Sequence, residues 1–128
     1  MYLVTKLHYH QRSKVLDILF DDNWQASLSC EFLRTHSPSA EVQGHQHQHG
    51  LKPSKLVLGK EQVAITQLEP VGHYAVRLIF DDGHQTGLFS WQYLRALAEQ
   101  QPQLWSAYQA RVTAHHETKD NIPIKFMP

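Results

Sequence analysis

Histidine is the residue whose chemistry stands out in this sequence, because 10 of the 128 residues are histidine. Three of them, His45, His47 and His49, alternate with glutamine in "GHQHQHG", so their imidazoles lie on one side of an extended chain. Imidazole binds zinc, copper, nickel and iron. A tight site, however, draws its ligands from separate rigid elements. This glycine-flanked stretch therefore predicts a solvated loop with weak metal affinity.

Other residues with reactive side chains have simpler interpretations. Cys30 lies in a short apolar stretch, which favours buried packing over a nucleophile. Asp81 and Asp82 in "FDDG" are typical turn formers, and His84 directly behind them has the pattern of an exposed hairpin residue. "HHE" at 115–117 lies in a predicted tail without a surrounding barrel of strands. Since no phosphate loop, CxxC, GxSxG or HExxH motif occurs, we expect no enzymatic activity.

The elements that position these residues come as a repeat. "ILFDDNWQASLSCEFLR" at 18–34 returns as "LIFDDGHQTGLFSWQYLR" at 78–95. In each copy alternating apolar residues predict a strand, Asp-Asn or Asp-Gly predicts a hairpin turn, and a short helix follows. Ser90 is a suitable cap for the second helix. Neither unit can bury its apolar face alone, so we expect the two units to pack together.

The remaining chain adds a strand near each unit and a final helix. "LVTKLHYH" and "EQVAITQLEPVG" have strand patterns, and a long loop rich in Ser, Pro, Gly and His separates the units. The predicted fold class is α+β, a compact and mostly antiparallel sheet built from two repeated hairpin-plus-helix units, with a C-terminal helix. The predicted domain covers 1–100, the helix packed on it covers 101–117, and 118–128 is predicted to be a disordered tail.

Composition excludes several classes of partner. The chain has 12 basic and 12 acidic residues, which argues against a nucleic-acid or anionic-membrane binder. With one cysteine it can form no internal disulfide, which favours a reducing compartment. The N-terminal stretch is too polar for a signal peptide. We therefore expect a cytoplasmic protein whose 128 residues are enough for one core.

Three motifs carry a resemblance to a known family: "LHYHQRSKVLDILFDD", "LRTHSPSAEVQGH" and "EPVGHYAVRLIFDDGHQTGLFSWQYL". From about Leu7 to Leu97 the chain resembles a small stand-alone bacterial member of the DUF971 family, also described as similar to the N-terminal domain of gamma-butyrobetaine hydroxylase. The resemblance implies a sheet-rich α+β domain. In the hydroxylases this domain precedes an iron/2-oxoglutarate barrel, and in plants a similar domain is joined to a P-loop iron–sulfur carrier. Neither has room here, so no activity carries over.

The resemblance also implies a corner where the hydroxylases hold a structural zinc through three cysteines and one histidine. The cysteine places fall at Ser37, Ser39 and Val42, and the histidine place falls at His84. Serine is a poor zinc ligand and valine is none. We therefore expect that no metal is required and that any zinc or iron is weakly held. The segment from Ser37 should still pack beside the hairpin that carries His84.

The resulting functional hypothesis is a non-catalytic protein-interaction domain, accessory to iron–sulfur or iron-dependent enzyme systems. The alternative is a metal-binding or metal-delivery protein that uses His84 and loop histidines, with His36, His45 and His84 as candidate metal ligands. The expected partner is a protein, not a nucleic acid or a membrane. The candidate partner-binding residues are His36, Ser37, Ser39, His45, His47, His49 and His84.

Overall fold

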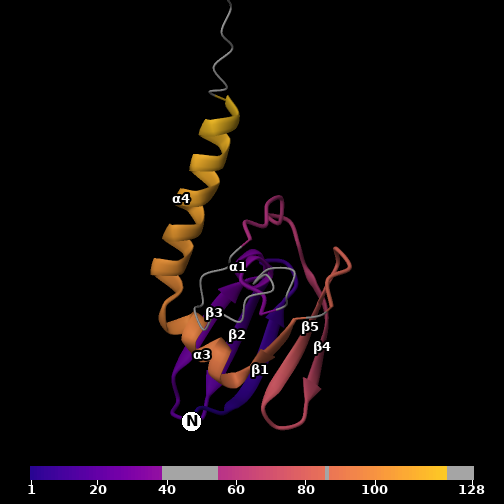
Figure 1. Cartoon of the computed structure of the whole chain (residues 1–128). Coiled ribbons are helices and arrows are strands. Elements are labelled where there is room, and N and C mark those ends of the chain that lie inside the picture. The colour runs from indigo at the N-terminus through magenta and orange to yellow at the C-terminus, as the bar shows by residue number, and fades with distance from the viewer. Residues whose placement is uncertain (39–54, 86, 121–128) are drawn as a thin grey trace, which may run out of the picture.

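The computed structural model describes residues 1–38, 55–85 and 87–120. The predicted histidine loop and the last eight residues lie outside these ranges. Two three-stranded antiparallel sheets and their helices form the body of the protein (Figure 1). The predicted α+β class is therefore confirmed, with two separate sheets rather than one.

The strands and helices follow the sequence repeat. The first sheet has the order β1-β2-β3 and the second has the order β4-β5-β6, and each is followed by a helix. The bounds are β1 Val4–His10, β2 Val15–Phe20, β3 Gln25–Ser29, α1 Cys30–Thr35, β4 Ile65–Val71, β5 Ala75–Phe80, β6 Leu88–Ser90, α3 Trp91–Glu99 and α4 Gln101–Asp120.

The repeat extends to the turns and caps. Asn23 and Gly83 hold the same turn position with φ of 67° and 89°, a conformation that glycine and asparagine tolerate best. Ser29 and Ser90 each accept a hydrogen bond from the amide three residues further on, so both helices are capped in the same way. Both sheets also carry a bulge in the first strand, at Thr5 and at Thr66, whose hydroxyls donate to a carbonyl of the next strand at 3.2 Å.

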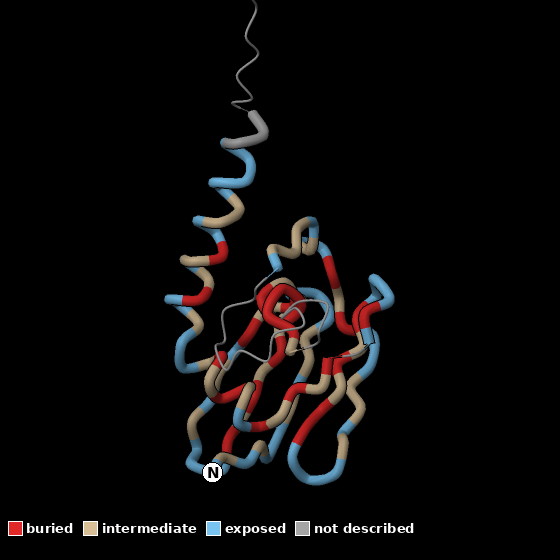
Figure 2. Tube along the Cα trace, viewed as in Figure 1, coloured by how far each residue is buried: buried red, intermediate tan, exposed pale blue. Residues whose placement is uncertain are grey.

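The apolar faces of the two units meet in one core, as the repeat predicts. Residues of both units belong to a single cluster of buried side chains, and Cys30 is fully buried in it. Figure 2 shows these buried segments along the strands and through α1. The largest fully buried side chains of the cluster are Leu16, Ile18, Phe20, Leu28, Phe32, Leu33, Leu78, Phe80, Phe89, Leu94 and Leu97.

Two arginine–aspartate pairs cross between the units. Arg34, near the end of α1, places Nε 2.8 Å from Oδ2 of Asp82 in the second unit's turn. Arg95, at the matching place in α3, places Nη1 3.0 Å from Oδ2 of Asp22 in the first unit's turn. Each helix therefore binds the turn of the other unit. The sequence repeat does not predict this exchange, although all four residues recur in it.

The last helix, α4, only partly joins this body. Leu104 and Tyr108 are buried, and the Tyr108 hydroxyl donates to the Val57 carbonyl at 2.6 Å. Residues 113–117 are exposed, and Figure 1 shows this part of α4 projecting away from the sheets. The helix runs to Asp120, three residues beyond the predicted end. None of the described helices has the length and apolar character needed to cross a membrane.

Candidate functional site

The predicted corner between the end of α1 and the second unit's turn is formed by direct contact. Oγ of Ser37 lies 2.9 Å from Nε2 of His84, and the two residues are 0% and 5% exposed. We call this pair the Ser37–His84 corner. The hairpin pattern alone favours an exposed His84, and that expectation is wrong because the chain after α1 packs over the turn.

A glycine allows this close packing. A Cβ atom added to Gly87 would lie 2.5 Å from Oγ of Ser37 and 3.0 Å from a ring carbon of Phe89. The 2.5 Å distance is far below van der Waals contact, so a side chain at position 87 requires movement of its neighbours. The backbone at Gly87 therefore closes the corner from the side of β6. Gly87 stands in "HQTG" but the sequence pattern gives no signal of this role.

Asp82 anchors the turn that carries His84. Its carboxylate contacts Nζ of Lys60 at 2.6 Å and Nε of Arg34 at 2.8 Å, and it accepts the backbone amide of His84 at 3.1 Å. Burial alone would raise the pKa of Asp82, but the bonds from Lys60, the His84 amide and Arg34 outweigh burial and hold the pKa at about 2. Asp82 is thus a charged centre as well as the predicted turn former. In the sequence, the only sign of this role is that Asp-Asp and Leu-Arg recur together in both copies of the repeat.

His36 belongs to the core rather than to an open site. Its side chain is buried between Phe32 and Tyr108, with ring centroids 4.5 and 5.9 Å away. Its Nδ1 lies 3.0 Å from the Phe32 carbonyl and 3.1 Å from the Thr35 hydroxyl. Burial lowers the pKa of His36 to about 4, so the ring is neutral at physiological pH. His36 precedes Ser37 in the sequence and His84 contacts its hydroxyl. The two histidine rings nevertheless have different neighbours.

The corner does not fit the zinc that the family resemblance implies. Ser37 stands at one cysteine place, and its hydroxyl is hydrogen-bonded to the imidazole at the histidine place. Within residues 1–38, 55–85 and 87–120 there is no group of three or more His, Cys, Asp or Glu side chains arranged to hold a metal. The other predicted residues, Ser39, Val42, His45, His47 and His49, lie outside the described ranges.

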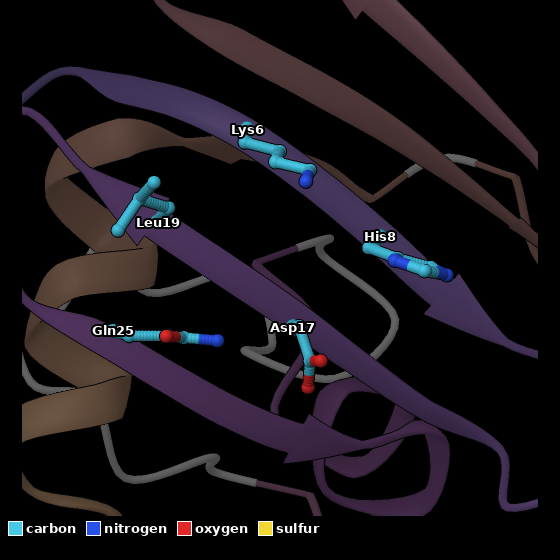
Figure 3. A pocket seen from close by; sticks show the side chains of 5 residues that line it. All are labelled: Lys6, His8, Asp17, Leu19 and Gln25. Atoms are coloured by element: carbon cyan, nitrogen blue, oxygen red, sulfur yellow. The ribbon is translucent and has the colours of Figure 1, made fainter.

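A small hollow on the outer face of the first sheet also contains titratable groups. Oδ2 of Asp17 lies 2.7 Å from Nε2 of His10, and Oδ1 accepts a hydrogen bond from Ser27 at 2.6 Å. These bonds, from Ser27 first and then His10, lower the pKa of Asp17. Both carboxylate oxygens are therefore already bound within the sheet. The hollow has a volume of about 160 Å³ and is lined by Lys6, His8, Asp17, Leu19 and Gln25 (Figure 3).

A larger groove lies beside α4 and was not anticipated from the sequence. Its volume is about 370 Å³, and it runs between α1, the turn before β4 and α4. We call it the α1–α4 groove. Its lining includes Glu31, Glu61, Trp105, Tyr108, Gln109 and Val112.

Comparisons with known proteins place this fold in a defined group. Residues 7–95 match the family described as "Gamma-butyrobetaine hydroxylase-like, N-terminal". A protein solved by NMR in solution is 47% identical, with a TM-score of 0.77 and coverage of 91% of this chain and 83% of that one. A second NMR structure is 39% identical, with a TM-score of 0.76 and coverage of 100% and 99%.

A crystal structure provides a third relative. It is of a protein of unknown function from Acidithiobacillus ferrooxidans, assigned to the DUF971 family, and it is 35% identical to this chain. The TM-score is 0.61, and the match covers 75% of this chain and 92% of that one. No curated protein matches the sequence.

The burial of neutral His36 predicts a specific loss of stability in acid. Its folded pKa of about 4 lies below the ordinary value of 6.5, so between these values the unfolded chain binds a proton that the folded chain does not. Stability is full above pH 6.5 and falls as the pH drops toward 4. Linkage gives a loss of about 2 kcal/mol between pH 8 and pH 5. The variant His36→Phe has no imidazole at this position, so it should not show this pH-dependent loss of stability.

Urea denaturation of wild type and His36→Phe at both pH values measures the difference. The free energy of unfolding of wild type should fall by about 2 kcal/mol more than that of the variant. An equal fall in the two proteins would contradict a buried neutral His36.

Proposed function

This chain belongs to the gamma-butyrobetaine hydroxylase-like, N-terminal (DUF971) family, and on that premise we propose that it is a non-catalytic domain that works by binding another protein. The family resemblance favours a partner from iron–sulfur or iron-dependent enzyme systems in the cytoplasm. This follows from the two protein classes in which similar domains are joined to an iron enzyme or an iron–sulfur carrier.

One observation supports the proposal: protein contacts close the corner that corresponds to the zinc site of the hydroxylases. The 2.9 Å contact between Ser37 and His84 and the backbone at Gly87 occupy this space. Asp82, bound by Arg34 and Lys60, fixes the turn behind it. The result supports a rigid platform from which the long segment 39–54 departs. Loops on rigid scaffolds are the usual site of recognition.

The burial of the corner assigns different roles to the candidate partner-binding residues. His36, Ser37 and His84 are each at most 5% exposed, so they shape the platform and leave little surface for a partner. We assign direct contact with the partner to the segment that follows, which contains Ser39, His45, His47 and His49.

Affinity purification of the tagged full chain under anaerobic conditions tests this role. In a variant with His45→Ala, His47→Ala and His49→Ala, the described core is unchanged, and the proteins that co-purify with wild type should fall at least about tenfold, equivalent to a loss of about 1.4 kcal/mol in binding. The matched control replaces His115 and His116, two exposed histidines of α4, and should retain the partner. Full retention by the triple variant would contradict the assignment.

The alternative function is metal binding or delivery by His84 and the loop histidines. The histidine content favours it, whereas the hydrogen-bonded Nε2 of His84 and the serine at a cysteine place oppose it. We propose that folding requires no metal, because the described residues already supply a continuous apolar core.

Chelation distinguishes the two functions. A metal that binds only the folded chain raises its melting temperature by mass action, so its removal would lower the thermal transition. We expect exhaustive EDTA treatment, followed by removal of the chelator, to leave the transition unchanged. A large decrease that one equivalent of zinc restores would favour the metal-binding alternative.

A further inference from the structure

The α1–α4 groove has a fixed aromatic wall. The rings of Trp105 and Tyr108 are stacked, with centroids 5.2 Å apart and planes 17° from parallel. Phe32 packs edge-on against Trp105 at 6.1 Å. The Tyr108 hydroxyl is bound to the Val57 carbonyl, so the tyrosine ring cannot turn away. Rigid aromatic faces of this kind bind planar or cationic groups with little loss of side-chain entropy.

Two carboxylates, those of Glu31 and Glu61, line the same groove. Glu31 comes from the first turn of α1 and Glu61 from the turn before β4. Within the described ranges no ion pair involves either residue, whereas Asp22 and Asp82 are both paired with arginine. Burial and then the charge of Glu61 raise the pKa of Glu31, so both disfavour its charged form.

The electrostatics at Tyr108 agree with this geometry. Its pKa is raised to about 12 by burial and then by the negative charges of Glu31 and Glu61. Arg111 acts in the opposite direction there and also acts on His36, but it does not line the groove. The groove thus presents net negative charge beside an aromatic surface.

Elsewhere in the chain, a similar combination of carboxylates and aromatic rings surrounds the side chain of Arg95. The guanidinium of Arg95 lies 4.1 Å from the ring centroid of Tyr2 and 4.4 Å from that of Trp24. It also contacts the carboxylates of Asp22 at 3.0 Å and Glu99 at 2.6 Å. Arg95 is therefore an arginine held by two carboxylates over aromatic rings. The α1–α4 groove has two carboxylates and two aromatic rings, and none of the described residues that line it is an arginine.

We propose that the α1–α4 groove binds an arginine side chain on a segment of the partner protein, with Glu31 and Glu61 paired to the guanidinium and Trp105 beneath its plane. Arginine fits better than lysine because its planar group stacks on aromatic faces and binds carboxylates at two points. The proposal rests on the proposed function, since the ligand belongs to a protein partner. The groove adjoins the Ser37–His84 corner through the contact of Tyr108 with His36, so one partner can cover both.

Titration of the isotope-labelled full chain with N-acetyl-L-arginine amide tests the groove by NMR. The neutral matched probe is N-acetyl-L-citrulline amide, which has the same shape and no charge. The Trp105 indole and Tyr108 amide signals should shift and saturate with the arginine probe, while the Trp24 and Trp91 indoles serve as internal references. The citrulline probe should bind at least about tenfold more weakly, the ratio for about 1.4 kcal/mol.

Removal of the two glutamate charges provides a second test. Glu31→Gln combined with Glu61→Gln should weaken binding of the arginine probe about threefold to tenfold, as expected for pairs near the surface. This variant should melt no lower than wild type, because the two carboxylates lack cations within the described ranges. Glu117→Gln, an exposed glutamate further along α4, is the matched control and should bind like wild type. Absence of shifts at Trp105, equal binding of citrulline, or unchanged binding by the double variant would each overturn the proposal.

The outcomes separate the groove from the proposed function. A partner protein captured equally by wild type and by the Glu31→Gln/Glu61→Gln variant would overturn the groove and leave the interaction role intact. Saturable arginine binding by a chain that retains no partner protein would support the groove and count against the interaction role. Concentration-dependent dimers that form in wild type and disappear in the double variant would assign the occupant to a second copy and overturn a partner-borne arginine.

Discussion

The ion pair between Arg34 and Asp82 is the contact on which the corner depends. It joins the helix of the first unit to the turn of the second, and that turn carries His84 to Ser37. Its counterpart between Arg95 and Asp22 joins the units in the other direction. The Arg34 and Asp82 side chains are only 4% and 20% exposed. An interaction in this shielded place is weakened little by solvent or salt.

One of the crossed pairs supplies a protein contact at the corner where the family resemblance implies a zinc. A structural zinc would link the end of α1 to the second turn, and here the Arg34–Asp82 pair and the Ser37–His84 contact make that link. The α1–α4 groove lies next to the corner, because Tyr108 in the groove lining contacts His36, the residue before Ser37.

Local pattern predicted the strands, the turns and the cap at Ser90, because each depends on neighbours in the sequence. The alternation around Phe20 and Phe80 and the Asp-Gly turn are examples. The contact of the Ser37 segment with the His84 hairpin was expected only through the family resemblance. The burial of His36 and the formation of the groove were not predictable, since both depend on where α4 packs. Pattern within one element carries no information about that placement.

The central claim is that the two units are held together through Arg34 and Asp82, and a double-mutant cycle measures it. The cycle compares the free energies of unfolding in urea of wild type, Arg34→Met, Asp82→Asn and the double variant. Each single change should cost about 2 kcal/mol, because it removes a charge-assisted hydrogen bond between two shielded side chains, and the double variant should cost at least about 1 kcal/mol less than the sum. The reference cycle of Arg95 and Asp22, whose carboxylate is 44% exposed, should give a coupling below about 1 kcal/mol. Strict additivity for Arg34 and Asp82 would contradict the account.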